Sequence, residues 1–448
     1  MIDATSHPVR RAWSIGALAF LLPVALGSGA GAQTQAVASY PAASANGNIV
    51  APPRNPLPIA AEFDVRQIEA MAQALVADQK VPGLAMAIVH KGRVISMRGY
   101  GITDVRAAEP VDGHTVFRLA SLSKGFAGTL AGILVNDGVI RWDSRVSQYK
   151  PDFRLAEAGG GQGVTVADVL SHRMGLSHNA FDRDLEAYVD YPTLTRRLAN
   201  APLKCAPGTC YAYQNVAFSL IGDVVFAATG AFYGQEVQRR IFKPLGMNDA
   251  SVGLEGIQAS ARWARPHVHG RGGWVSVTPK STYYQVLPAA GVNASASDMA
   301  QWLIAQTGYR PDVLPAPLLE TLHRPLVDTP AETRASAWRR ERLGSAGYGL
   351  GWRAYNYAGN ELVFHGGAVQ GYRGAVAMLP DRDFGIALMW NSESSLPSAL
   401  VPTVLDRALG IKGQRWLRED FEEPSMYVQS MPGDAPGQGA IKATAAPY

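Results

Sequence analysis

The chain has 448 residues, enough for one large domain or two ordinary ones. Apolar residues make up 47% of it and charged residues only 17%, which excludes an intrinsically disordered chain. The net charge is 41 − 37 = +4 and no stripe of lysine and arginine occurs, so we expect no nucleic-acid partner. Two cysteines are too few for a disulfide-scaffold fold or a cysteine-rich zinc site, and we expect neither a metal nor a cofactor.

Residues 1–32 have the pattern of a cleavable export signal. Arg10 and Arg11 precede an uncharged apolar run at 12–26, and small residues of the A-x-A type follow up to Ala32. A membrane anchor is the alternative, but a proline within the run and the glycine-rich end weigh against it. We therefore predict a periplasmic or secreted protein that keeps no stable membrane anchor after cleavage.

The two cysteines lie close together in the sequence. Cys205 and Cys210 are separated by only four residues. Export would bring them into an oxidising compartment, where pairing is favoured. We predict a disulfide that closes this tight loop, with two free thiols as the alternative.

Residues 33–60 are rich in Ala, Pro, Ser and Asn and predict an extended linker. The periodicity that follows predicts helices at 64–79, 121–136, 217–229, from a capping box at 295–298, and at 402–409, and strands at 84–90, 93–100, 350–355, 361–364, 374–379 and 384–390.

Strands at both ends around a helical middle predict one sheet that both ends complete. We therefore expect one catalytic domain at 61–412. Its sheet part comprises 61–120 and 346–412, and its helical part is 121–345. Residues 413–448 lose all periodicity and predict a poorly ordered tail.

Ser121 and Lys124 form a Ser-x-x-Lys motif at the start of an apolar helix. This spacing places both side chains on one helix face. A lysine in a dry site loses proton affinity, so it can accept the serine proton and create a nucleophile. A helix cap beside a surface lysine is the alternative. A second copy, Ser147 to Lys150, directly precedes a proline, which disfavours the helical geometry that the pair needs.

Tyr213 and Asn215 form the only Tyr-x-Asn motif in the chain. A tyrosine near cations can shuttle protons, and an asparagine can donate to a substrate carbonyl while accepting from Lys124. A buried tyrosine beside a turn asparagine is the alternative. Ser177 and Asn179, in a Ser-His-Asn sequence, compete for the same role.

A His-Gly-Gly-Ala sequence at 365–368 follows a predicted strand. Its glycines would let a substrate backbone approach closely, and an edge strand there would pair with a peptide-like substrate. The amide of Ala368 would then join that of Ser121 as an oxyanion hole. An ordinary turn is the alternative. His267 and His269 alternate like metal ligands, but no third ligand completes a zinc set.

The three motifs, in this order, resemble the serine β-lactamase and penicillin-binding protein superfamily on its class C side. That family combines Ser-x-x-Lys, Tyr-x-Asn and then Lys-Thr-Gly or His-x-Gly. The resemblance covers about residues 62–412. It extends to flanking sequences such as Phe-Arg-Leu-Ala-Ser at 117–121, Tyr-Gly-Leu-Gly-Trp at 348–352 and Gly-Tyr-Arg-Gly at 371–374.

The resemblance implies an α/β (α+β) fold in which an antiparallel sheet is flanked by helices and carries an inserted, mostly helical domain. It implies an acyl-enzyme mechanism without a cofactor, and a role for each matching residue. Ser121 would be the nucleophile, Lys124 its proton partner and Tyr213 the general base. The substrate-binding residues would be Asn215, His365, Gly366, Gly367, Ala368 and Arg373.

The third motif departs from the commonest family pattern, because His365 and Gly366 stand where lysine and threonine are usual. Both changes should weaken the binding of a penicillin carboxylate, although Arg373 would supply a positive charge. We expect an exported serine hydrolase that acts on a β-lactam, a D-amino-acid or peptidoglycan peptide, or a carboxylic ester. The alternative is a penicillin-binding receptor or pseudoenzyme that acylates or binds without turnover.

Overall fold

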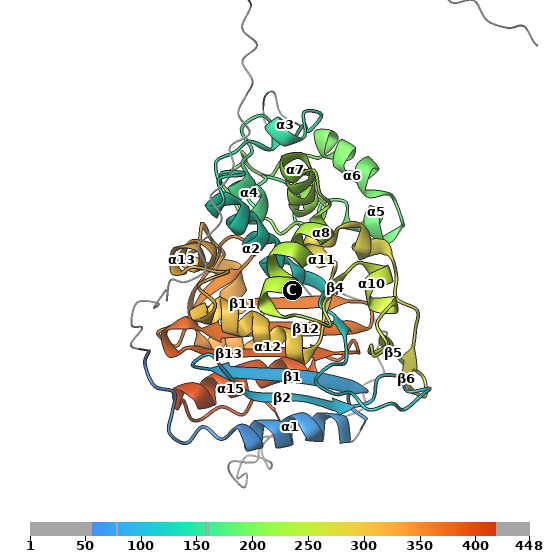
Figure 1. The fold of residues 1–448 in the computed structure, drawn as a ribbon, viewed down its shortest axis with the longest axis vertical. Helices are drawn as coiled ribbons and strands as arrows, with labels where there is room; N and C mark the ends of the chain where they lie inside the picture. Colours follow the sequence, from blue (N-terminus) through green and yellow to red (C-terminus); the bar gives the residue numbers. More distant parts are fainter. Residues whose placement is uncertain (1–55, 78, 157–158, 160, 418–448) are drawn as a thin grey trace, which may run out of the picture. The chain divides into compact units, whose positions relative to one another are not determined.

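The computed structural model describes residues 56–77, 79–156, 159 and 161–417. The predicted export signal, the predicted linker up to residue 55 and the predicted tail from residue 418 lie outside the described residues. Within them the fold is an antiparallel sheet flanked by helices, which confirms the predicted fold class (Figure 1).

The largest sheet has eight strands in the order β2-β1-β13-β12-β11-β10-β9-β8, and all neighbours are antiparallel. The strands are β1 (Gly83–His90), β2 (Arg93–Gly101), β8 (Val327–Asp328), β9 (Leu343–Tyr348), β10 (Arg353–Tyr357), β11 (Asn360–Val369), β12 (Tyr372–Leu379) and β13 (Phe384–Trp390). β1 pairs with β13, so the two ends of the described chain meet inside one sheet, as predicted.

Helices cover both faces of this sheet, which explains why β1 is buried along nearly its whole length. α1 (Val65–Ala77) and α15 (Leu400–Leu409) pack on one face, in a core that includes Leu75, Ile88, Trp390 and Leu405. α2 (Ser123–Asn136) and α12 (Ala296–Ile304) share the core of the other face, which includes Phe126, Trp302, Val376 and Met389.

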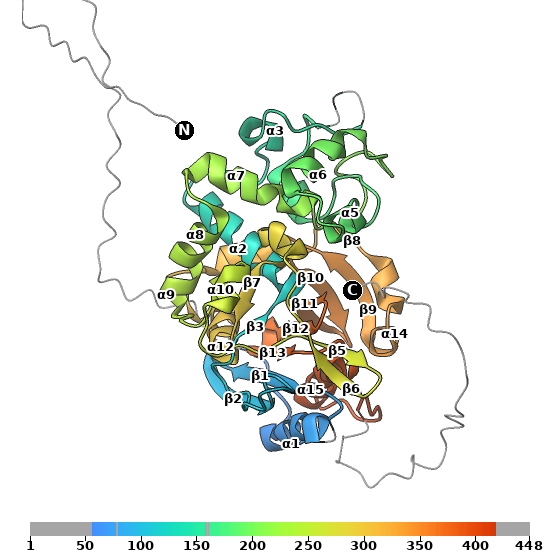
Figure 2. The same cartoon turned by 90° about the vertical axis from the view of Figure 1, so that its right-hand side faces the viewer.

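The middle of the chain is mostly helical, and several of its helices gather on the side away from β1 and β2 (Figure 2). Its remaining helices are α3 (Val146–Tyr149), α4 (Val166–Leu170), α5 (Asp182–Glu186), α6 (Tyr191–Arg197), α7 (Leu220–Thr229), α8 (Tyr233–Val237), α9 (Lys243–Leu245), α10 (Leu254–Gln258), α11 (Leu287–Ala290), α13 (Ala316–His323) and α14 (Ala337–Arg342). Among the described helices, none is by itself both long and apolar enough to cross a membrane. One bent pair, Ala217–Thr229 with Tyr233–Leu245, meets those two criteria jointly.

Two small sheets were not predicted, and all their strands except β3 lie in this middle region. One has the order β3 (Phe117–Arg118), β7 (Val292–Ala294), β4 (Ser251–Val252), and the other pairs β5 (His267–Gly270) with β6 (Gly273–Ser276). Strands of two to four residues are too short to show an alternating pattern, so their pairing depends on tertiary contacts.

The predictions near the third motif were wrong in two places. The predicted strand at 350–355 begins only at Arg353, because the preceding turn packs so tightly on α2 that a Cβ at Gly351 would overlap the Lys124 carbonyl oxygen. The predicted strand at 361–364 continues through both glycines to Val369, because they stay paired with β12.

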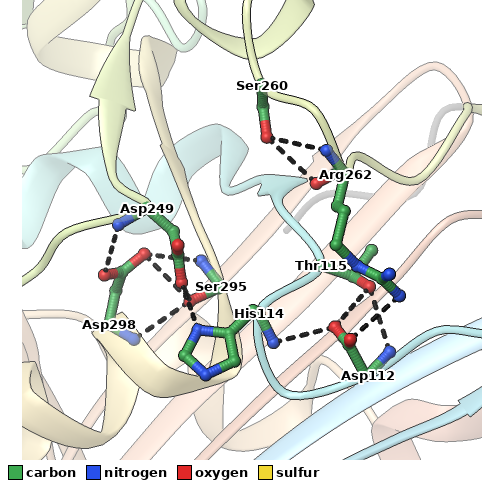
Figure 3. Close-up of polar contacts among 8 residues, drawn as sticks. All are labelled: Asp112, His114, Thr115, Asp249, Ser260, Arg262, Ser295 and Asp298. Atoms are coloured by element: carbon green, nitrogen blue, oxygen red, sulfur yellow. Dashed lines mark hydrogen bonds and ion pairs between the residues drawn. The ribbon is translucent and has the colours of Figure 1, made fainter.

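Polar contacts fix the segment that leads to β3 (Figure 3). The His114 ring donates to the Asp249 carboxylate over 2.9 Å, and the Ser295 hydroxyl donates to the same carboxylate over 2.8 Å. Asp112 pairs with Arg262 over 2.9 Å. Ser295 also caps α12, as predicted. These contacts join the segment before β3 to the helical region and thereby position the turn that carries Ser121.

Candidate active site

Ser121 lies in a 3₁₀ turn, Ala120–Leu122, directly before α2. Leu119 donates its amide to the Val292 carbonyl of β7 over 3.0 Å, which holds the turn in place. Ala120 has a φ of +48°, a left-handed conformation that costs an alanine about 1–2 kcal/mol. Such strain is often found at functional sites. Ser121 itself is half-buried, between the buried helix and the surface.

Lys124 is fully buried one turn further along α2. Its ammonium lies within hydrogen-bond distance of the Ser121 hydroxyl oxygen (3.3 Å), the Asn215 side-chain oxygen (2.7 Å) and the Ala289 carbonyl oxygen (3.1 Å). Burial lowers the pKa of Lys124 well below its usual value, although the Asp182 carboxylate opposes that shift. The geometry therefore suits a lysine that takes up the proton of the Ser121 hydroxyl.

Asn215 connects Lys124 to a buried carboxylate that the sequence motifs did not reveal. Its side-chain amide donates to Asp182 over 2.7 Å. Burial raises the pKa of Asp182 to about 6, while the Asn215 hydrogen bond lowers it. The Tyr283 hydroxyl donates to the same carboxylate over 3.3 Å. A continuous polar chain thus runs from Ser121 through Lys124 and Asn215 to Asp182.

Tyr213 lies on the other side of the same ammonium, and the Lys124 nitrogen is 4.6 Å from its ring centroid. Burial raises the pKa of the Tyr213 phenol above its usual value, while Arg353 and the Ser121 side chain both act to lower it. The phenol therefore holds its proton at neutral pH in the free site. This condition suits a group that first donates a proton and takes one up later.

His172 and the cysteine loop position the Tyr-x-Asn segment. The Gln214 amide donates to His172 Nδ1 over 3.1 Å, and the His172 ring lies 4.4 Å from the Tyr213 ring. Cys205 and Cys210 form a disulfide, with 6.3 Å between their Cα atoms, which confirms the predicted pairing. The competing Asn179 donates its backbone amide to the Tyr213 carbonyl over 2.8 Å, a contact that braces this segment.

β11 forms the opposite wall of the site. Its ladder with β10 ends at Phe364, whereas its ladder with β12 continues to Val369. One edge of residues 365–369 therefore lies outside the ladder with β10, where an extended substrate can pair. Gly367 is pressed against the serine turn, because a Cβ there would lie 2.5 Å from the Leu119 oxygen and 3.1 Å from the Ser121 nitrogen. Ala368 follows on the same half-buried edge.

Both ring nitrogens of His365 are engaged by the protein. Nδ1 lies 2.7 Å from the Gly366 carbonyl oxygen, which can only accept, so Nδ1 donates. Nε2 then accepts from the Tyr348 hydroxyl over 3.0 Å. Burial lowers the pKa of His365 well below its usual value, and the positive charge of Arg353 lowers it further. The ring is thus neutral and has no free nitrogen for a substrate in this arrangement.

Arg373 lies on β12, next to the third motif. It pairs with Ala368 and Trp390 across the sheet, and its strand position faces the same side as Ala375, toward α15. There it lines a cavity of about 180 Å³ together with Trp338 and other side chains. The cavity also reaches Gly366 and Gly367, so it begins at the wall that Gly367 shares with the serine turn.

The other candidates do not join this site. Lys150, at the end of α3, has φ −130° and ψ 83°, so it leaves the helical geometry of the second Ser-x-x-Lys motif. His267 is buried, while His269, two residues along β5, is exposed. Across the residues that the structure describes, no group of three or more His, Cys, Asp or Glu side chains is arranged to hold a metal ion.

Comparisons with known proteins agree with this geometry. The chain is 26% identical over 345 residues to the unguisins hydrolase ungD' of Aspergillus campestris, covering 74% of this chain and 63% of that protein. It is 24% identical over 338 residues to protein flp of Staphylococcus aureus, covering 75% and 65%. The chain therefore spans slightly less than two thirds of the length of these relatives.

Solved structures share the fold. The octameric penicillin-binding protein homologue from Pyrococcus abyssi superposes with a TM-score of 0.70 at 24% identity, over 79% of each chain. A structure described as SurE superposes with a TM-score of 0.62 at 23% identity, over 78% of this chain and 77% of that one. The family model described as Beta-lactamase matches residues 68–410, which contain all three motifs. The chain therefore belongs to the β-lactamase family of serine hydrolase-like proteins.

Proposed function

We propose that this chain is an exported serine hydrolase of the class C-related type, which cleaves an ester or amide through an acyl-enzyme on Ser121. The observation that carries the proposal is the buried Lys124 side chain, whose nitrogen contacts the Ser121 hydroxyl and the Asn215 side chain and whose lowered pKa favours the neutral amine that can accept a proton. We also propose a periplasmic or secreted location, which the signal-like residues 1–32 support.

The proposed reaction has two balanced halves. Ser121 Oγ attacks the substrate carbonyl while its proton moves to Lys124, 3.3 Å away. The amides of Ser121 and Ala368 stabilise the oxyanion. The protonated Tyr213 gives its proton to the leaving alcohol or amine, and the proton on Lys124 replaces it. Water then attacks the acyl-serine carbonyl and gives a proton to the neutral Lys124 amine. The bond between the acyl carbon and Ser121 Oγ breaks, Lys124 returns the proton to Oγ, and the acid leaves.

We propose an uncharged ester as the preferred substrate, rather than a β-lactam or a D-amino-acid peptide. The last two carry a carboxylate, which a cation beside the third motif would bind. In this chain His365 is neutral, and Arg373 lies at the cavity on the α15 side. That cavity combines apolar walls at Phe364 and Trp390 with the side chains of Arg339 and Arg373, so its lining suits an apolar group that carries a polar end.

Labelling with a fluorescent fluorophosphonate tests the assignment of the nucleophile. Ser121→Ala should abolish labelling, while Ser147→Ala, in the second Ser-x-x-Lys sequence, should label like the unmodified protein. Full labelling of the Ser121→Ala protein would refute the proposal. A panel of p-nitrophenyl acetate and butyrate, nitrocefin and a D-Ala-D-Ala peptide then ranks the substrate classes.

A receptor that acylates without turnover is the second candidate. The observation that favours it is the raised pKa of Tyr213, because a protonated phenol cannot accept a proton from the deacylating water. A burst of product equal to one enzyme equivalent, with no steady-state release afterwards, would favour the receptor. Steady turnover of an ester favours the hydrolase.

A further inference from the structure

Arg353 is a buried cation that none of the three motifs contains. It is the first residue of β10 and is 3% exposed. Its guanidinium carbon lies 5.6 Å from the ring centroid of Tyr213 and 5.8 Å from that of Tyr348. A cation at this distance from an aromatic ring is attracted to it, most strongly where water is excluded.

Glu332 anchors this guanidinium. Arg353 Nη1 lies 2.6 Å from Glu332 Oε1, and Tyr355 donates its hydroxyl to Glu332 Oε2 over 3.0 Å. Arg339 pairs with the same carboxylate. The cluster of Arg353, Arg339 and Glu332 therefore has a formal charge of 2 − 1 = +1. One carboxylate cannot neutralise both guanidiniums, so a net positive charge remains beside the phenol.

The other groups that face Tyr213 do not supply a permanent positive charge. They are Lys124, His172, His178, His365, Tyr211, Tyr348, Asp182 and Glu332. Burial lowers the pKa of all three histidines, so they are neutral, and Lys124 must change its charge during the reaction. An arginine keeps its proton at any pH that the protein survives.

We propose that Arg353 is a positioning residue for Tyr213: held by Glu332, its guanidinium orients the phenol and supplies the fixed positive charge that stabilises the phenolate during proton transfer. The inference rests on the proposed hydrolase function and adds a residue to its proton pathway. The sequence predicted only that a tyrosine near cations can shuttle protons, and Arg353 on β10 is such a cation.

The test measures the second-order rate of Ser121 labelling by a fluorophosphonate between pH 5 and 10. Arg353→Gln should move the acidic limb of the profile up by roughly one pH unit, because the guanidinium also lowers the pKa of Lys124, which must lose its proton before it can accept that of Ser121. Arg353→Lys keeps the charge and should restore most of that shift. Arg340→Gln, on α14, removes an exposed guanidinium that bonds to the Arg334 carbonyl and lies outside the Glu332 cluster, so the limb should stay in place.

A double-mutant cycle tests whether Arg353 acts through Tyr213 or through another group. On the plateau above the acidic limb, where Lys124 is neutral in every variant, Arg353→Gln should slow labelling about tenfold in the unmodified protein and less than twofold in Tyr213→Phe, because the cation would then have no phenol to act on. Equal losses in both backgrounds would overturn the inference.

A structural role would also overturn it. In that case Arg353→Lys and Arg353→Gln would lower the rate equally at every pH, in proportion to their loss of thermal stability. If the unmodified protein is not labelled on Ser121 at all, the proposed function itself fails. If labelling is normal but the Arg353→Gln profile is unmoved, only the inference on Arg353 fails.

Discussion

The two walls of the site work in different ways. The wall built around α2 consists of side chains: Ser121, Lys124, Asn215 and Asp182 form a polar chain in which each group contacts the next. The β11 wall at residues 365–369 consists of backbone and glycines, and the ring of its polar side chain, His365, bonds to protein groups. In the proposed function the first wall would therefore carry proton transfer and the second would carry substrate contact.

Lys124→Met, a change in the first wall, should lower the rate of Ser121 labelling more than any other variant. The variant removes the group that accepts the Ser121 proton, so we expect the labelling rate to fall roughly 10³-fold. Lys150→Met, in the second Ser-x-x-Lys sequence, should change it less than twofold. A Lys124→Met protein that labels at the normal rate would mean that another base serves Ser121.

Gly367→Ala tests the second wall by its shape alone. The added Cβ would lie 2.5 Å from the Leu119 oxygen, so the serine turn must shift, and a shift near 1 Å costs about 10²-fold in rate. Gly366→Ala is the matched control, because its nearest neighbour would be Phe364 at an ordinary 3.7 Å. Equal effects of the two variants on fluorophosphonate labelling would show that the close approach to Ser121 is unimportant.

Asp182→Asn should change the pH dependence of the first wall while keeping its hydrogen bond to Asn215. The Asp182 carboxylate raises the pKa of Lys124, so its removal lowers that pKa and moves the acidic limb of the labelling profile down by roughly one pH unit. Asp184→Asn, on the same helix, removes an exposed charge paired with Arg197 and should leave the limb in place. An acidic limb that moves to higher pH would mean that the Asp182 carboxylate does not raise the pKa of Lys124.

Replacing both Cys205 and Cys210 by serine should have the smallest effect on chemistry. Closing so short a loop stabilises the folded state by roughly 2 kcal/mol. We therefore expect a lower midpoint in urea denaturation and a labelling rate within about threefold of normal. Loss of labelling in a protein that is still folded would show that the disulfide positions Tyr213 directly.

The sequence predicted the first wall far better than the second. Residues three apart on a helix must share a face, so their spacing alone pairs Ser121 with Lys124. Asp182 was not found, because nothing in a five-residue helix shows which distant amide its carboxylate will meet. The sheet face on which Arg373 lies and the hydrogen bonds of the His365 ring depend on strand register, including where the ladder between β10 and β11 ends. Packing sets that register. Arg353 was missed because it reaches Tyr213 from a neighbouring strand.

The pairing of β1 with β13 has a consequence for synthesis. Because strands near both ends of the chain must join before the sheet is complete, the wall next to Ser121 cannot form while the later part is still being made. A ribosome-bound or truncated chain that ends before Trp390 would therefore lack the complete sheet, and we expect it to be inactive. The proposed hydrolytic activity would appear only once β13 had been made and had paired with β1.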